Sequence, residues 1–526
     1  MPLSPSRKPA QDLELLRQLE RKVLWLSAWM IHNANYLRAK SDDLKVGGHQ
    51  ASCASVVSIM TALYFSILRP EDRIAIKPHA SPVFHAIQYL LGNQTRDKLD
   101  RFRGFGGAQS YPSRTKDTDD VDFSTGSVGL GAAITAFASL IQDYIATKEW
   151  ASDFDGGRMI ALVGDAELDE GNIYECLLEG WKHGLRNTWW IIDFNRQSLD
   201  GIVHEGLYDK IEQIFQAFGW EVVTLKYGEL QCAAFEERGG HALKGWIDAC
   251  PNPLYSALIY QGGAAWRKRL MDDIGDQNDV TALLDRRSDD ELAKLMANLG
   301  GHCLSTLIQA FDNTKDDRPL CFIAYTIKGW GLPLAGHKDN HAGIMTPDQM
   351  ATLQANMNIR DRREWEPFEG LSVSQEEIEE FLSNVPFNAR VRRRHAAATI
   401  PIEGFPKIEG ARMSTQEGFG KILNEIAHCD AAFVDRIITT SPDVTVSTNL
   451  GAWVNYRNLF ARQATADVFR EEKVVSGQKW SFSPSGQHFE LGIAENNLFL
   501  LLCAAGLAHS LFGERLLPIG TVYDPF

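Results

Sequence analysis

The stretch RMIALVGDAELDEG, residues 158–171, joins a short apolar run to a cluster of carboxylates. Residues 158–163 predict a buried strand, and four acidic side chains follow within residues 165–170. A second apolar run, TWWIIDF (188–194), is followed directly by a polar residue, Asn195, thirty residues after Asp165. A strand–helix–strand unit of this length makes a right-handed crossover, so both polar residues should lie at the carboxyl edge of one parallel sheet.

Strand-like runs alternate with helical stretches from residue 51 to about 330. The other runs of this kind are 73–76, 221–225 and 319–327, and residues 132–145 predict the clearest helix. Such alternation predicts an α/β fold, a doubly wound parallel sheet with helices on both faces. We expect a helical arm over 1–50, with an amphipathic helix at 12–35, and a first domain over 51–385. Residues 265–315 predict a charged helical insertion in that domain.

A second unit is predicted from residue 413 onward, after a proline- and arginine-containing linker at 386–412. Ser414 and Glu417 have capping-box spacing at the start of a helix. A strand is predicted at 435–440, an apolar helix at 494–512, and a further strand after that helix. Because the chain ends in this apolar strand at Phe526, we expect residues 413–526 to be a truncated second domain, and the chain to be a fragment.

Composition narrows the class of protein. A net charge of -15 disfavours a nucleic-acid or membrane-surface role. Eight scattered cysteines without a Cys-x-x-Cys pair suit a reducing, cytoplasmic location. The first twenty residues lack the apolar region of a signal peptide, and no uninterrupted apolar run reaches the ~18 residues of a membrane span.

Asp165 has two interpretations. It is either an N-terminal cap for a helix starting near residue 168, or a ligand for a cation. The pairing with Asn195 favours the cation, because a carboxylate, an amide oxygen and a nearby carbonyl are hard oxygen ligands of the kind that Mg²⁺ prefers. Glu167, Asp169 and Glu170 are interpreted as residues of the first helical turn, with Glu170 near the site.

The same two segments resemble the thiamine diphosphate motif, Gly-Asp-Gly followed after about thirty residues by Asn. The chain has Gly164, Asp165 and Ala166 at the first three positions, so alanine replaces the last glycine. The longer run is similar to the transketolase superfamily of thiamine diphosphate-dependent enzymes, and within it to the homodimeric pyruvate dehydrogenase first component. The resemblance implies thiamine diphosphate as cofactor, with Mg²⁺ held by Asp165, Asn195 and the carbonyl of Gln197.

Other segments resemble the same family in the same order: VGGHQAS (46–52), HASP (79–82), TGSVGLG (125–131), YTIKGWG (325–331) and DNHAG (339–343). The resemblance assigns them catalytic residues and residues facing the cofactor, namely His49, Ser52, His79, Val128, Gly129, Lys328 and His341. Taken one at a time, a histidine in such a loop is more often structural. His302 is interpreted as structural although it has a counterpart in the family.

A second specific signal is FELGIAENN, residues 489–497. Glu495 begins the apolar helix and is expected to be largely buried. Negative charge at a helix N-terminus is its alternative role. By the resemblance, Glu495 hydrogen-bonds the aminopyrimidine ring of the cofactor and activates it, with Phe526 stacked on that ring and Tyr523 close by. The family further implies a homodimer in which Glu495 reaches the metal site of the partner subunit.

These features predict thiamine diphosphate- and Mg²⁺-dependent decarboxylation of a 2-oxo acid, with pyruvate the first candidate and a lipoyl-bearing acyltransferase the acceptor. Transketolase, which moves two-carbon ketol units between sugar phosphates, is the alternative. Residues 437–455 depart from the acidic segment of the pyruvate branch and leave substrate and acceptor open. A non-catalytic fragment or regulatory homologue is the alternative of another class. A nicotinamide dehydrogenase is disfavoured, because no G-x-G-x-x-G follows the first strand.

Overall fold

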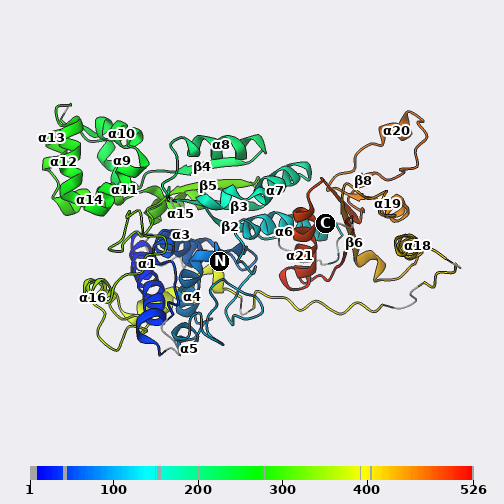
Figure 1. Cartoon of the computed structure of the whole chain (residues 1–526), viewed down its shortest axis with the longest axis horizontal. Helices are drawn as coiled ribbons and strands as arrows, with labels where there is room; N and C mark the ends of the chain where they lie inside the picture. The colour runs from blue at the N-terminus through cyan, green and yellow to red at the C-terminus, as the bar shows by residue number, and fades with distance from the viewer. Residues whose placement is uncertain are drawn as a thin grey trace.

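The computed structural model describes residues 9–39, 44–148, 150, 156–197, 201–277, 279–314, 316–390, 392–402, 406–410 and 412–523. Their strands form two five-stranded sheets flanked by helices (Figure 1). The strand orders are β1-β2-β3-β5-β4 and β10-β6-β9-β7-β8, and every pairing is parallel. The predicted α/β class with a doubly wound parallel sheet is confirmed.

The first sheet contains all five strands predicted between residues 51 and 330. They are β1 Arg73–Ala75, β2 Met159–Gly164, β3 Thr188–Phe194, β4 Glu221–Leu225 and β5 Leu320–Tyr325. Side chains of β2 alternate between two apolar cores, with Ile160 and Leu162 in one and Ala161 and Val163 in the other. Because successive side chains of a strand point to opposite faces, this sheet is buried on both sides.

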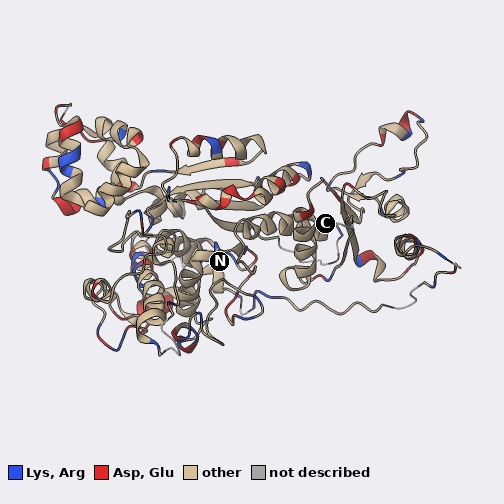
Figure 2. Ribbon diagram, viewed as in Figure 1, with Lys and Arg blue, Asp and Glu red and all other residues tan. Residues whose placement is uncertain are grey.

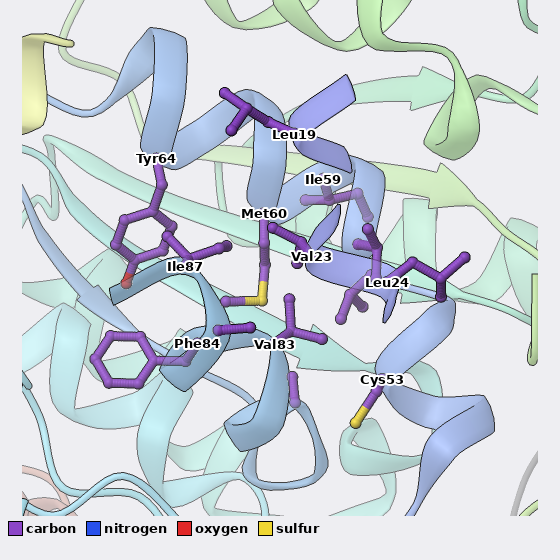
Figure 3. Close-up of a cluster of buried hydrophobic side chains, with 14 of the residues drawn as sticks. Leu19, Val23, Leu24, Cys53, Ile59, Met60, Tyr64, Val83, Phe84 and Ile87 are labelled. Carbon is purple, nitrogen blue, oxygen red and sulfur yellow. The ribbon is translucent and has the colours of Figure 1, made fainter. Parts of the chain in front are cut away.

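One face of the first sheet is covered by helices from both ends of the first unit. These are α1 Pro9–His32 with a π-turn at Asn33–Leu37, α2 Gln50–Ala54, α3 Val57–Ala62, α4 Ser81–Leu90, α5 Arg96–Asp100, α15 Leu304–Asp312, α16 Pro347–Asn356 and α17 Gln375–Ser383. Figure 3 shows Leu19, Val23 and Leu24 of α1 packed with side chains of α3 and α4. This core holds α2, and hence the loop before it, against the sheet.

The other face carries α6 Leu130–Thr147, α7 Gly171–Lys182 and α8 Leu207–Ala217. A helical extension follows β4 and consists of α9 Glu229–Phe235, α10 Gly240–Ala249, α11 Asn252–Gln261, α12 Gly263–Ile274, α13 Val280–Asp285 and α14 Asp289–Ala297. The predicted helical insertion therefore begins earlier than residue 265. Its outer surface is rich in charged residues (Figure 2) and includes an ion pair between Arg267 and Asp289 at 2.6 Å.

The second sheet contains β6 Ile437–Pro442, β7 Leu459–Phe460, β8 Phe482–Ser483, β9 His488–Leu491 and β10 Leu517–Gly520. Its helices are α18 Thr415–Ala427, α19 Gly451–Arg457, α20 Val468–Glu471 and α21 Glu495–Leu511. The predicted strand at 435–440 is shifted, because Val434–Arg436 form a 3₁₀ turn before β6. Only half of the predicted capping box forms, since Ser414 accepts from Glu417 N but no return bond completes the pair.

The two sheets share a core through α6 and α21, which lie side by side (Figure 1). Within the described residues, α6 is the one helix long and apolar enough to cross a membrane, and 72% of it is buried in the protein. That packing identifies it as a core helix. Arg393, from the predicted linker, is buried against the first unit and pairs with Asp120 at 3.0 Å and Asp122 at 2.9 Å. The domain boundaries stay a prediction.

Candidate functional site

A cavity of about 270 Å³ opens at the carboxyl edge of the first sheet. Its lining comes from the turns after β1, β2, β3 and β5, the start of α2 and the turn before α6. The lining residues are Ser52, Lys77, Pro78, His79, Val128, Gly164, Asp165, Ala166, Glu167, Asn195, Gln197, Lys328 and His341. The structure thus brings together, from separate segments, most of the side chains predicted for the site. This edge is where open parallel sheets bind ligands.

Asp165 follows β2 and is 3% exposed. Its two oxygens accept hydrogen bonds from Ala166 N at 2.9 Å and Arg196 N at 2.8 Å. It does not cap the following helix, since α7 begins at Gly171 with Glu170 as its N-cap. Burial, reinforced by the charge of Asp193, raises the pKa of Asp165 to about 7. A bound cation would stabilise the ionised form that burial disfavours.

Asn195 follows β3 and lies at the same edge. Its Oδ1 accepts from Gln197 N at 3.0 Å, and the Gln197 carbonyl accepts from Lys328 Nζ at 3.2 Å. Carboxylate, amide and carbonyl oxygens therefore belong to residues that line one cavity. This donor set fits Mg²⁺, which takes one or two protein carboxylates and completes its shell with water and phosphate oxygens.

Ala166, which stands where the motif has glycine, is an exposed residue at the cavity rim, so its methyl group has room. Its N–H is already bonded to the Asp165 carboxylate.

Glu167 was not predicted as a site residue but lines the cavity, and its interpretation as a first-turn residue is confirmed. It lies in the 3₁₀ turn Asp165–Asp169, is 8% exposed, and accepts from Gly129 N and Gly164 N, both at 3.0 Å. One carboxylate thereby joins the turn after β2 to the glycine turn before α6. Gly129 has φ 81°, and an added Cβ would lie 2.8 Å from Asn172 Oδ1, so this junction requires glycine.

Three histidines predicted from separate segments form one cluster. The ring centroids of His49 and His79 are 3.9 Å apart, and His341 lies 4.9 and 5.4 Å from them. Burial, followed by neighbouring positive charge, lowers the pKa of His79 to about 3 and of His341 to about 4. The cluster is therefore neutral at physiological pH, and its free ring nitrogens can accept or relay protons.

Lys328 donates to His341 Nδ1 at 2.9 Å, which fixes that nitrogen as an acceptor. Burial lowers the pKa of Lys328 to about 8. His302 is outside the cavity lining. Its Nε2 accepts from Ile327 N at 2.8 Å, and its ring stacks on Trp330, so the structural interpretation of His302 agrees with its contacts.

Two further residues were not predicted, namely Lys77, which lines the cavity, and its buried partner Asp193, which does not. They form a buried ion pair with Nζ and Oδ2 2.5 Å apart. Burial alone would lower the pKa of Lys77, but the Asp193 carboxylate raises it. Burial alone would raise the pKa of Asp193, but the charge of Lys77 lowers it. An aspartate inside the apolar run TWWIIDF is the sequence signal that could have identified this pair.

The second-unit residues are not in the cavity lining. Glu495 begins α21, as predicted, and is half-buried in the single chain. The Tyr523 hydroxyl donates to Ser447 Oγ. Phe526 lies outside the described residues. Residues beside Glu495 contact α7, where Asn497 Nδ2 donates to Glu175 O at 3.1 Å and Gly492 N to Glu179 Oε2 at 3.0 Å.

The fold and the oxygen-lined cavity define a thiamine diphosphate-binding α/β protein of the transketolase type. Residues 48–237 match the family described as transketolase, thiamine diphosphate binding domain. This match, and the similarity to the relatives below, confirm the resemblance predicted from the motifs.

Several relatives are similar along most of the chain. The pyruvate dehydrogenase E1 component of Corynebacterium glutamicum is 24% identical over 98% of this chain and 58% of its own length. That of Escherichia coli K12 is 26% identical over 67% of this chain and 40% of its own length. The solved transketolase of Campylobacter jejuni superposes with a TM-score of 0.60 at 17% identity, covering 97% of this chain and 65% of that one. The chain spans about three fifths of the length of the curated relatives it matches.

Proposed function

We propose that the protein is an enzyme that decarboxylates a 2-oxo acid with thiamine diphosphate and Mg²⁺, pyruvate being the substrate we propose. The observation that carries this proposal is the cavity lined by Asp165, Asn195, Lys328 and two of the three clustered histidines, His79 and His341. Similarity to pyruvate dehydrogenase E1 components along most of the chain supports it.

Mg²⁺ would be held by Asp165, Asn195 and the Gln197 carbonyl, with the diphosphate against the glycine turn at Val128 and Gly129. Bound thiamine diphosphate would supply a nucleophilic carbon and an electron sink. The residues of the chain then provide binding and proton transfer. The glycine turn precedes α6, whose N-terminus favours negative charge.

Lys328 and the histidines act on the 2-oxo acid. The ammonium group of Lys328 pairs with the substrate carboxylate, and the His49 and His79 rings lie where they can donate to the ketone oxygen through water or directly. His341, with Nδ1 bonded to Lys328, is the relay that returns a proton after carbon dioxide leaves. Buried neutral imidazoles suit this role, because a charged cluster would repel the adjacent lysines.

A homodimer is part of the proposal. Three side chains on one face of α7 are exposed, Tyr174 by 40%, Leu178 by 43% and Trp181 by 61%. Ile493 and Phe499, on either side of Glu495, are exposed by 79% and 54%. Because α7 packs against α21, these residues frame Glu495 with apolar surface, which a second copy of the chain would cover. Glu495 would then act in the cofactor site of its partner.

The acyl acceptor we propose is a lipoyl group on an acyltransferase. Transketolase chemistry is the second candidate, and one observation favours it. A pocket of about 670 Å³ lined by Arg38, Lys45, Arg101 and Arg103 adjoins the histidine cluster, since Lys45 Nζ donates to Ala342 O at 3.4 Å. Four cationic side chains beside the catalytic cavity suit a phosphate group.

Paired assays separate the two activities. Pyruvate with a dye acceptor, and xylulose 5-phosphate with an aldose acceptor, are each tested with thiamine diphosphate and Mg²⁺. We expect turnover with pyruvate. Turnover only with the sugar phosphate would assign the transketolase activity. Cofactor binding without turnover in either assay would contradict the proposal and leave a non-catalytic homologue.

A further inference from the structure

The buried carboxylate of Asp193 lies beneath the proposed metal site without lining the cavity. Its Oδ2 accepts from Lys77 Nζ, from Ser55 Oγ at 2.7 Å and from Asn195 Nδ2 at 3.1 Å. Its Oδ1 accepts from the Thr326 hydroxyl. Asp193 is fully buried and both its oxygens are engaged, so its position is fixed by four donors, three of which come from other segments of the chain.

This contact determines the orientation of the Asn195 amide. A carboxylate paired with an ammonium group only accepts hydrogen bonds, so the Asn195 atom beside it must be the NH₂ end. The opposite end, Oδ1, faces Gln197 N at 3.0 Å, which is a donor and requires an oxygen there. Both neighbours therefore agree, and Oδ1 is the Asn195 atom left on the side of the site.

We propose that Asp193 is the positioning residue of the metal site, because its contact with Asn195 Nδ2 presents the Asn195 oxygen, rather than the NH₂ group, to Mg²⁺. An NH₂ group cannot ligate a cation, so a flipped amide would remove one ligand. The inference rests on the proposed function. The inference adds to the proposed metal site a residue that touches neither the metal nor the cofactor. Residues that orient metal ligands typically contribute about 10–100-fold to metal affinity.

Lys77 serves the same arrangement by keeping Asp193 ionised within a buried region. Thr326 immediately follows β5, so the Asp193 contacts also join β3 to β5 at the edge of the sheet. If Asp193 acted only through its charge, neutralising it would change the Mg²⁺ affinity equally with Asn or with Asp at position 195. If Asp193 instead orients the side chain of residue 195, its effect requires a side chain with two different ends, such as the oxygen and NH₂ group of Asn195.

The test is a double-mutant cycle between Asp193→Asn and Asn195→Asp. Calorimetry measures the Kd of Mg²⁺ at saturating thiamine diphosphate in the wild type, both single variants and the double variant. We expect Asp193→Asn to weaken Mg²⁺ binding about tenfold or more with Asn at 195. We expect a change below about threefold with Asp at 195, because a carboxylate has an oxygen at either end.

An equal loss in the two backgrounds, or no loss in the wild-type background, would overturn the proposal. Thermal unfolding of each variant shows whether it is folded. Asp193→Asn leaves the charge of buried Lys77 uncompensated and could prevent folding. In that case the double variant Lys77→Met/Asp193→Asn is compared with Lys77→Met alone. The same tenfold loss of Mg²⁺ affinity is expected between these two variants. Absence of Mg²⁺-dependent cofactor binding in the wild type would refute the proposed function instead.

Discussion

Glu167 allows a quantitative prediction, because its carboxylate connects the turn after β2 to the glycine turn before α6. Its two oxygens accept one backbone N–H each, from Gly129 and Gly164. Glu167→Gln keeps the shape but has only one accepting oxygen, so one buried N–H faces an NH₂ group. Loss of a hydrogen bond to a charged group costs about 1.5–3 kcal/mol. We therefore expect local opening of the two turns to become about 2 kcal/mol easier.

Hydrogen exchange followed by mass spectrometry measures this opening. Since 1.4 kcal/mol is a factor of ten, about 2 kcal/mol corresponds to roughly 30-fold faster exchange in peptides containing Gly129 and Gly164. Asp169→Asn is the matched control, because Asp169 lies in the same 3₁₀ turn but is exposed. The reasoning is refuted if Glu167→Gln exchanges at the wild-type rate, or if Asp169→Asn accelerates exchange as much.

Three further predictions concern stability, docking of the linker and assembly. Burial raises the pKa of Glu20 from 4.5 to about 7. The neutral carboxyl is tolerated in the folded state, so its contribution to the free energy of unfolding is fully present below the unfolded pKa. About 3 kcal/mol of that free energy is lost as the pH rises through 7. Glu20→Gln should therefore gain stability relative to wild type between pH 5 and 8 in thermal unfolding, and a constant difference would contradict this. Arg393→Ala should cost about 3 kcal/mol, because buried Asp122 loses its closer cationic partner and keeps only Arg73 at 3.9 Å. Arg392→Ala, at an exposed position, is the control, and equal shifts in unfolding temperature would argue against the ion pair. Trp181→Glu should give a monomer in sedimentation velocity, whereas Tyr260→Glu, on a different exposed surface, should stay dimeric; a Trp181→Glu dimer would exclude this face as the interface.

The first sheet was predictable because its signal is local. Each strand is a short apolar run, and two of them, β3 and β4, have the predicted limits. Polar residues at the ends of such runs also predict the site, since the carboxyl ends of parallel strands meet at one edge. Asp165 and Asn195 were found in this way and do line one cavity.

The missed residues act through contacts that spacing does not encode. Glu167 looks like any acidic residue at a helix start, and only the fold brings Gly129 to it. Lys77 precedes a turn without a motif of its own, and its partner Asp193 is 116 positions away. Asp193 alone carried a signal, as a charge within a buried strand. Glu495 is half-buried in the single chain, and the proposed dimer would cover the exposed apolar side chains on either side of it.

The central claim is that Asp165 and Asn195 form a site for Mg²⁺ and thiamine diphosphate. Calorimetric titration of thiamine diphosphate into the protein, with Mg²⁺ and with a chelator, tests it most directly, with Asp165→Asn as the comparison. We predict binding that requires Mg²⁺ in the wild type and is lost in Asp165→Asn. Binding of equal affinity in the chelator, or in Asp165→Asn with Mg²⁺, would contradict the account.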